Sequence, residues 1–377
     1  MISIGWRNLK RDPWRSGVAV LGVMFAVVLV TVEVGMLLGL VRNASLLIDT
    51  SKADLWVSTV DVKTFDFATP FDQRKRYRIE AIPGVERVEE FNVCYSVWKL
   101  PGGGNANIQV ISMDERGSLP APLNLVAGSL DALHNQDAVI IDEAERDKLG
   151  SPTIGDTVEI MQHRAKVVGF TRDMRSFTTT PYVFTTLRRG ENYGWLTKNG
   201  DKLSIYMLVK VKPGFDREEV RKAISARIPD IEVHTREGFS WRTRSYWLIE
   251  TGMGLGFLAA ALLGLMVGGV IVSQTLYAMT MEKLPEFGVL KALGASMHEI
   301  ARIVLEQSLI CGAAGLLLGL SIAYAIGAAA GAAGTSVEIP AALIAATVAL
   351  TGLLCASAAL LSIFRLRKVE PGMVFRT

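Results

Sequence analysis

The stretch Tyr277-Ala-Met-Thr-Met-Glu-Lys-Leu-Pro-Glu-Phe-Gly-Val-Leu-Lys-Ala-Leu-Gly-Ala-Ser296 is a short polar island between two long apolar runs. Pro285 suits the first turn of a helix, because the backbone N–H that proline lacks has no partner there. Gly294 follows the last apolar residue, where a left-handed C-terminal position favours glycine. The segment that starts at Ser296 and reaches Glu299 has the pattern of a capping box. We therefore expect a small amphipathic helix of roughly two and a half turns, followed at once by another helix.

The composition of the chain indicates a membrane protein with a large aqueous part. Of its 377 residues, 50% are hydrophobic and 20% are charged. This balance is too apolar for an ordinary soluble protein and too charged for a protein that lies wholly in lipid. The cysteines Cys94, Cys311 and Cys355 offer no disulfide framework, because only Cys94 lies outside the apolar runs.

Four apolar runs are long enough to cross a hydrocarbon core of about 30 Å, and they are predicted as spans at 16–41, 251–280, 308–331 and 341–364. Two polar residues lie deep within them, Glu33 in the first and Gln274 in the second. A carboxylate inside a span is costly. Glu33 is therefore either a structural group near an interface or a group that takes part in coupling or substrate contact.

Positive charge predicts how the chain is oriented. The segments 1–15, 281–302 and 365–376 carry lysines and arginines, whereas the short loop 332–340 carries none. Because positive loops stay on the cytoplasmic side, we expect a cytoplasmic N-terminal segment (1–15), helix region (281–300) and tail (365–377). The chain would then be a multi-pass protein of the cytoplasmic (inner) membrane, with the domain 42–250 in the periplasm.

The domain 42–250 reads as an α+β fold. The segments Arg78-Ile-Glu-Ala-Ile-Pro83 and Ala223-Ile-Ser-Ala-Arg-Ile-Pro229 look alike, and each leads into a strand-like segment. This predicts two β-α-β units with a β-rich insertion between them. At the end of the domain, Trp241, Tyr246 and Trp247 form an aromatic group typical of a lipid–water interface. Glycine pairs with four-residue spacing in the spans predict close helix packing, either within one bundle or in a dimer.

Motifs for catalysis, metal binding or nucleotide binding do not occur in this sequence. There is no Gly-x-x-x-x-Gly-Lys-Ser/Thr phosphate loop and no Gly-x-Ser-x-Gly nucleophile turn. The histidines are scattered, at 134, 163, 234 and 298, and none forms a metal pair. We therefore expect a non-catalytic chain that binds no cofactor and no nucleic acid.

The segment from Glu282 to Ser296, with its Lys-Ala-Leu-Gly-Ala ending, resembles the signature of the FtsX/MacB superfamily of ABC transporter permeases. The resemblance extends to the third span, to the tail Leu366-Arg-Lys-Val-Glu-Pro371, and to the layout of one span, a large external domain and three more spans. Ile154-Gly-Asp-Thr-Val158 is similar to part of the MacB-like periplasmic core domain. The chain looks most like the DevC-like subgroup, whose members work with a separate ATPase subunit.

This resemblance implies a permease whose partners supply the energy and the conduit. A cytoplasmic ABC ATPase dimer would bind ATP and Mg, and a second permease copy would complete a homodimer. Motion would pass to the periplasmic domain through a rigid join at residues 241–250 and drive a lipid, peptide or drug-like cargo through a periplasmic membrane-fusion adaptor and an outer-membrane channel. Two alternatives share these motifs: an FtsX-like signalling permease that activates a cell-wall hydrolase, and LolC-like lipoprotein release.

The predicted site of ATPase coupling is the helix in the polar island. Its apolar side chains would rest on the ATPase, its charged side chains would set the register, and Gly294 would end the helix. The apolar group is Phe287, Val289, Leu290 and Leu293, and the charged group is Glu282, Glu286 and Lys291.

Overall fold

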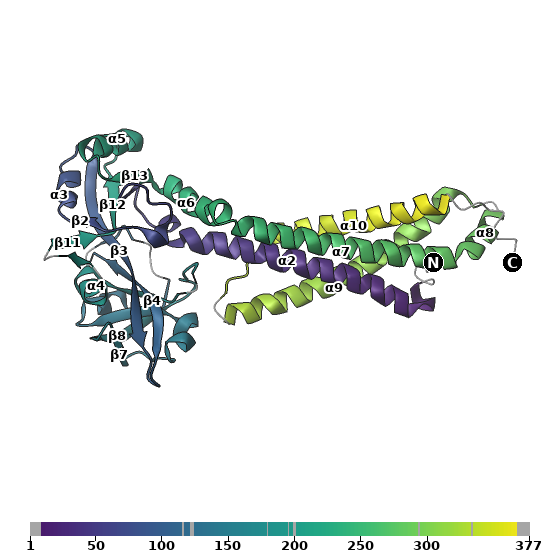
Figure 1. The fold of residues 1–377 in the computed structure, drawn as a ribbon, viewed down its shortest axis with the longest axis horizontal. Helices are drawn as coiled ribbons and strands as arrows, with labels where there is room; N and C mark the ends of the chain where they lie inside the picture. Colours follow the sequence, from purple (N-terminus) through teal and green to yellow (C-terminus); the bar gives the residue numbers. More distant parts are fainter. Residues whose placement is uncertain are drawn as a thin grey trace. The chain divides into compact units, whose positions relative to one another are not determined.

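The computed structural model of the chain describes residues 9–114, 117–120, 124–178, 180–194, 196–198, 201–292, 295–332 and 335–367. The chain divides into two compact units (Figure 1). The helical unit contains the residues up to Gly39 and those from Met253 onward, and the α+β unit contains Leu40–Gly252.

Four helices of the helical unit are long and apolar enough to cross a membrane. They are α2 (Pro13–Asp49), α7 (Met253–Glu282), α9 (Met297–Ala332) and α10 (Ala341–Arg367), and the short helix α8 (Leu284–Ala292) lies between α7 and α9 in the chain. The predicted fold class, four membrane-spanning helices with an α+β domain inserted after the first, is confirmed.

Glycines let α7 and α9 approach α2 closely. A Cβ atom added at Gly264 or Gly268 of α7, or at Gly315 or Gly319 of α9, would lie 2.5 to 2.7 Å from side-chain atoms of α2. Such distances are too short for any real Cβ contact, so these positions require glycine. The pairs Gly264/Gly268 and Gly315/Gly319 therefore serve packing within one chain, whereas Gly331 of the pair Gly327/Gly331 has open space around it.

The spacing of the glycine pair in α2 predicts a neighbouring helix, but the pair lies against a non-helical segment. Gly35 and Gly39 face the loop before α10, where the backbone oxygen of Ser336 would lie 2.3 Å from a Cβ at Gly39. The Glu338 N–H donates a hydrogen bond to the Gly35 carbonyl oxygen at 3.0 Å. This pair therefore accommodates an extended segment and not a second helix.

The α+β unit is built on a split β-α-β sheet. Its strands have the order β13-β1-β12-β3, and each neighbouring pair is antiparallel. The two predicted β-α-β units are thus present, and the strand that follows the first helix, β3, continues to Lys99. The elements are β1 (Leu55–Ser58), α3 (Lys75–Glu80), β3 (Val85–Lys99), β12 (Tyr206–Val211), α5 (Arg217–Arg227) and β13 (Glu232–Thr235).

The insertion between β3 and β12 is a small closed barrel. The pairing runs β3-β4-β9-β6-β8-β7 and returns to β3, so the second half of β3 belongs to the barrel. Buried apolar side chains from all six strands form one cluster. The new strands are β4 (Asn105–Met113), β6 (Ala138–Asp142), β7 (Thr157–Ile160), β8 (His163–Thr171) and β9 (Tyr182–Thr186).

Shorter elements complete the α+β unit. Strand β5 pairs with β8, and β10, β11 and β2 form a separate small sheet. The strands are β2 (Phe71–Asp72), β5 (Leu125–Gly128), β10 (Thr197–Lys198) and β11 (Asp201–Ser204), and the helix is α4 (Leu187–Tyr193). The unit also contains three short 3₁₀ helices among the described residues, namely η1 (Phe65–Phe67), η2 (Leu130–His134) and η3 (Glu143–Leu149).

Both faces of the split sheet are covered, because its strands place alternate side chains on opposite faces. Leu55 and Val57 of β1 pack with the helices α3 and α5. Trp56, between them, packs on the other face in an aromatic core that includes Phe239 of α6 (Arg236–Ser245). The end of α2, by which the chain enters the unit, and α6, by which it leaves, therefore pack on the same face of the sheet.

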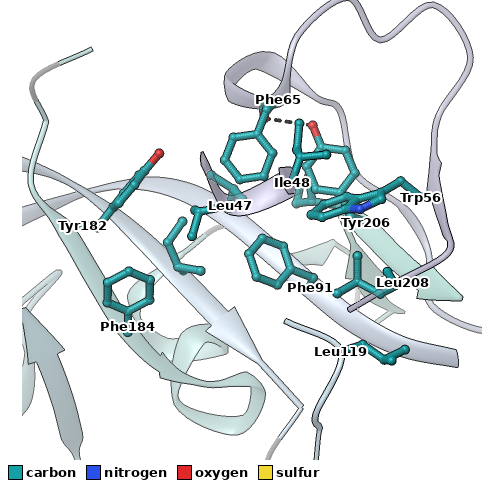
Figure 2. Close-up of a cluster of buried hydrophobic side chains, with 14 of the residues drawn as sticks. Leu47, Ile48, Trp56, Phe65, Phe91, Leu119, Tyr182, Phe184, Tyr206 and Leu208 are labelled. Atoms are coloured by element: carbon teal, nitrogen blue, oxygen red, sulfur yellow. Dashed lines mark hydrogen bonds between the residues drawn. The ribbon is translucent and has the colours of Figure 1, made fainter. Parts of the chain in front are cut away.

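The end of α2 is part of this aromatic core. Leu47 and Ile48 lie among the rings of Trp56, Phe91 and Tyr206 (Figure 2). The Trp56 ring packs edge-on against Phe91 and Tyr206, with centroid distances of 5.6 and 5.5 Å. The helix of the first predicted span therefore does not end near residue 41, because burial of its last turns carries it on to Asp49.

Candidate coupling site

Helix α8 is held against α9 by a buried aromatic side chain. Phe287 is only 4% exposed and packs against Met297, Ile300 and Ile303. Burial of this side chain on α9 fixes α8 in place, and the predicted role of Phe287 in the ATPase contact stays a prediction.

The two glutamates near α8 pair with the start of α2. Arg15 pairs with Glu282, and Arg11 Nη1 lies 3.7 Å from Glu286 Oε1. Exposed ion pairs of this kind contribute little stability, typically less than about 1 kcal/mol. Both glutamate side chains remain more than half exposed, so their predicted role of setting the register on a partner stays a prediction. Sequence patterns did not reveal these pairs, because the partners are about 270 residues apart.

Val289 is the predicted contact residue that faces solvent, with 61% of its surface exposed. The side chains of Leu290 and Lys291, and all of Leu293 and Gly294, lie outside the described residues. The capping box at the start of α9 is confirmed in both directions: the Ser296 N–H donates to Glu299 Oε2 at 2.7 Å, and the Glu299 N–H donates to Ser296 Oγ at 3.3 Å. The capping box fixes where α9 begins after α8.

The intramembrane candidates Glu33 and Gln274 do not form one site. Glu33 is partly buried on α2, whereas Gln274 is exposed on α7. Gln274 lines a groove of about 390 Å³ between α7 and α10, together with Ser273, Tyr277, Ser357 and others. Gly22 of α2 packs on Ile271, next to this groove. Glu33 lies eleven residues further along α2, or roughly 16 Å at 1.5 Å per residue.

The return path from the α+β unit to α7 is an interrupted helix. Helix α6 passes into a π-helical turn, η4 (Tyr246–Glu250), and Gly252 then adopts a left-handed conformation with φ of +73°. A π-turn and a left-handed residue both break the regular helical hydrogen-bond ladder. Residues 241–250 are helical throughout, but the regular helix is interrupted before α7 begins, and the rigidity of this join stays a prediction.

Helix α6 is nevertheless tied firmly to the end of α2. Arg244 pairs with Asp49, and its Nε donates to Ser45 Oγ at 2.7 Å. Ser45 Oγ in turn donates to Asp49 Oδ2 at 2.7 Å. Together with Phe239, which is fully buried, these contacts join the last turns of α2 and the helix α6 within one core.

An unforeseen polar group lies beside η4. Asp66 of η1 is only 7% exposed, and Gln109 Nε2 donates to its Oδ1 at 3.3 Å. Burial raises the pKa of Asp66 to about 6, while the hydrogen bond from Gln109 and the nearby indole N–H of Trp247 oppose this shift. A sequence signal for it did exist, since Asp66 stands alone between Phe65 and Phe67.

Trp247 is half-buried and packs on other rings of the α+β unit, while its predicted place at a lipid–water interface stays a prediction. Its ring lies 4.1 Å from that of Phe177 and 5.9 Å from that of Phe67, centroid to centroid. Trp241, by contrast, is 64% exposed and remains free to meet a lipid headgroup region. The predicted aromatic group is thus divided between two environments.

The described residues contain no cluster of three or more histidine, cysteine or acidic side chains that could hold a metal ion. Cys94, Cys311 and Cys355, which all lie in the described part of the chain, form no disulfide. The groups found near α8, η4 and Asp66 can bind, orient or move segments of the protein, and they do not form a nucleophile with an adjacent base.

Comparison with known families identifies both parts of the chain. Residues 16–227 match the MacB-like periplasmic core domain, and residues 258–371 match the FtsX-like permease C-terminal region. Among solved structures, the periplasmic region of MacB from Actinobacillus actinomycetemcomitans aligns with 50% of this chain and 92% of its own, at 11% identity and a TM-score of 0.37.

Two curated relatives are similar over about half of the chain. An uncharacterised ABC transporter permease of Methanocaldococcus jannaschii is 29% identical over 180 residues, which cover 45% of this chain and 43% of the relative. The macrolide export ATP-binding/permease protein MacB of Escherichia coli K12 is 23% identical over 204 residues, 49% of this chain and 30% of the relative. The chain thus spans less than half of each relative's length. With a MacB-like periplasmic core domain and an FtsX-like permease region both matched, the chain belongs to the FtsX/MacB family of ABC transporter permeases.

Proposed function

We propose that this chain is the membrane subunit that converts ATP hydrolysis by a separate cytoplasmic ATPase into movement of the α+β unit. An ABC permease implies a partner ATPase, and the family indicates a non-catalytic role for this subunit. The observation that carries the proposal is α8, a short helix fixed from behind by Phe287 and exposing Val289 on its other side. A short helix that is fixed on one face and presents an exposed apolar side chain on the other is suited to docking in a groove of a partner.

The proposed path of movement starts at α8 and follows the chain. The ATPase displaces α8, and α7 carries the displacement along its length to Gly252 and η4. Beyond that joint, α6 shares a core and an ion pair with the end of α2. Movement of α7 relative to α2 would therefore act on the joint first, because α6 and the end of α2 are held together.

The cargo and the remaining partners follow from the family and are part of the proposal. We propose export of a lipid, peptide or drug-like molecule by a homodimer, with a periplasmic adaptor and an outer-membrane channel forming the conduit. Four apolar helices and the match to a periplasmic domain indicate an inner-membrane protein. We propose that both termini and α8 face the cytoplasm, because the basic segments lie there under the positive-inside rule.

Purification of the whole chain in mild detergent, with mass spectrometry of what remains bound, tests the proposal. We expect an ABC ATPase together with an adaptor that has a coiled-coil hairpin. A cell-wall hydrolase in place of the adaptor would favour the signalling alternative, and bound lipoprotein would favour lipoprotein release. A chain that hydrolyses ATP by itself, or that binds no ATPase at all, would contradict the proposal.

A pair of matched variants tests the docking surface itself. Val289→Asp places a charge on the exposed face of α8 and should abolish recovery of the ATPase. Val60→Asp makes the same change at a valine that is 50% exposed in the α+β unit, and it should leave the ATPase bound. Equal recovery with both variants would exclude Val289 from the contact.

A further inference from the structure

Asp66 is a buried carboxylic acid. Among the described residues, the groups that shift its pKa include no cation. The groups that act on it are Gln109, Trp247 and its own backbone. Its Oδ2 atom is buried and makes no hydrogen bond of normal geometry among these residues. An ionised carboxylate in such a place is costly, because neither water nor an opposite charge replaces its solvation.

The titratable groups that face Asp66 from the neighbouring strands are tyrosines. Tyr95 of β3, Tyr182 of β9 and Tyr206 of β12 each have a pKa that is raised, first by burial and then by the charge of Asp66. They remain neutral at ordinary pH. Asp66 is therefore the group in this cluster whose charge can change near neutral pH.

The three residues of η1 all interact with the return path to α7. The Phe65 N–H donates to Thr243 Oγ1 of α6 at 3.3 Å, and the Phe67 ring packs on Trp247 of η4. Asp66 lies between them in the chain, and the indole N–H of Trp247 lowers the pKa of Asp66. Trp247 Nε1 is itself buried without a hydrogen bond of full geometry. Asp66 and Trp247 thus each leave one polar atom unsatisfied at the same contact.

The opposite side of η1 is fixed by the sheet. Tyr206 Oη donates to the Phe65 carbonyl oxygen at 2.8 Å, and the two rings are stacked with a centroid distance of 5.6 Å (Figure 2). Gln109 is held in turn by Ser176, whose Oγ donates to its Oε1 at 3.1 Å. The moving partner in the contact is therefore η4, which has the irregular backbone, and not η1.

We propose that Asp66 is a proton-dependent lock on the joint: the neutral acid keeps η4 packed against η1, and ionisation favours a state in which Trp247 withdraws and water reaches the carboxylate. The direction follows from linkage. A packed state in which the acid titrates at about 6 binds its proton more tightly than an open state in which it titrates near 3.8. Protons therefore favour the packed state, and a rise in pH through about 6 favours the open one.

The lock is a property of the α+β unit and needs no partner, although its bearing on transport rests on the proposed function. Because η4 leads into α7, the charge of Asp66 would set how readily the joint yields when α7 moves. On the external side of a membrane, the local pH would then tune the coupling between the ATPase and the α+β unit.

Quenching of Trp247 fluorescence by acrylamide tests the lock in the full chain in detergent. The chain has seven tryptophans, so the signal of Trp247 is taken as the difference between each protein and its Trp247→Phe counterpart. Between about pH 5 and about pH 8, we expect quenching of Trp247 to rise with a midpoint near 6. In Asp66→Asn, which keeps the shape of the neutral acid, Trp247 should stay shielded at every pH.

Two further variants make the result specific. Asp61→Asn is the matched control, because Asp61 is exposed in the same segment and its φ of +64° suits asparagine as well. It should keep the pH profile of the unchanged protein. Gln109→Met removes a donor to the carboxylate, so the midpoint should move to higher pH.

Several outcomes would overturn the lock. A pH profile in Asp66→Asn like that of the unchanged protein would show that another group titrates, and a flat profile in the unchanged protein would show that the joint does not open. If Asp66→Asn cannot be purified, Gln109→Met replaces it as the test. A pH midpoint of Trp247 quenching that does not rise in Gln109→Met would equally overturn the lock. None of these measurements involves an ATPase, so failure of the lock and failure of the proposed function are distinguishable.

Discussion

The chain enters and leaves the α+β unit by two helical segments that are built differently. On entry, α2 continues as one helix to Asp49 and buries Leu47 and Ile48 in the aromatic core. On exit, α6 gives way to the π-turn η4, and Ile249 near its end is 71% exposed. One connection is regular and buried, whereas the other is irregular and partly solvent-exposed.

This difference indicates which connection resists change and which one yields. A continuous helix with buried terminal turns can bend only at the expense of core packing. A π-turn followed by a left-handed glycine has already lost regular hydrogen bonds, and the segment can change its angle at little further cost. We infer that α2 acts as the fixed reference for the α+β unit and that η4 with Gly252 acts as its joint.

The largest effect is expected from the same substitution placed in each connection. Ile48→Ala creates a cavity in the aromatic core and should lower the free energy of unfolding of the α+β unit by about 3 kcal/mol. Ile249→Ala, at an exposed position, should change it by less than about 0.5 kcal/mol. Chemical denaturation followed by tryptophan fluorescence measures both. Equal losses would mean that the two connections are equally buried, against the comparison.

A pH-dependent effect of nearly the same size should come from Asp66, beside the joint. Because burial raises the pKa of Asp66 from 3.8 to about 6, the folded state binds this proton more tightly than the unfolded state does. Stability should therefore fall as pH rises from about 4 to about 6, by up to about 3 kcal/mol. Unfolding free energies of Asp66→Asn should lack this fall and should exceed those of the unchanged protein above pH 6. Identical pH slopes in the two proteins would refute the assignment.

Glycine substitutions in the joint and just beyond it should change stability with opposite signs. Gly252→Ala forces a Cβ into a left-handed conformation and should destabilise the chain by about 1 kcal/mol. Gly256→Ala lies in the regular part of α7 with open space around it, so it should stabilise the helix by up to about 1 kcal/mol. Thermal melting of the full chain in nanodiscs compares them. Shifts of the same sign would show that Gly252 is not a required break.

The smallest effect concerns the ion pair that ties the two connections together. A double-mutant cycle on Arg244→Ala and Asp49→Ala should give a coupling energy of about 0.5 to 1 kcal/mol, because the pair is about one-third exposed and shares Ser45. The control cycle on Lys63→Ala and Glu250→Ala concerns a more exposed pair, 2.8 Å apart, and should give no measurable coupling. A larger value in the control cycle would place the main tie at the joint itself.

Local patterns predicted a large part of the fold. The four apolar runs became helices, the Ser296–Glu299 pattern became a capping box, and the two similar segments became β-α-β units. Each of these features depends on residues close together in the chain, where periodicity and capping chemistry act directly. The closed barrel was foreseen only as a β-rich insertion, because its closure depends on strand pairs far apart in sequence.

The candidate site was predicted less completely, since its side chains take their roles from distant neighbours. The sequence singled out α8 correctly as a helix, but it gave no sign that Phe287 would be buried on α9 or that Glu286 would meet Arg11. Trp247 illustrates the same limit, because an aromatic residue beside a span suits both a lipid interface and a protein core. Only the structure reveals the ring contact between Trp247 and Phe177, which gives Trp247 a neighbour within the protein.

The sequence by itself determined the four apolar helices, the α+β character of the inserted domain and the family, because hydrophobic length, period and motif are properties of contiguous residues. Only the tertiary structure decided that the polar island's helix is anchored by Phe287, that α2 reaches the aromatic core, and that the return path is broken at Gly252 beside the buried Asp66. The physical reason is that burial, ion pairing and pKa depend on which distant residues fold against one another.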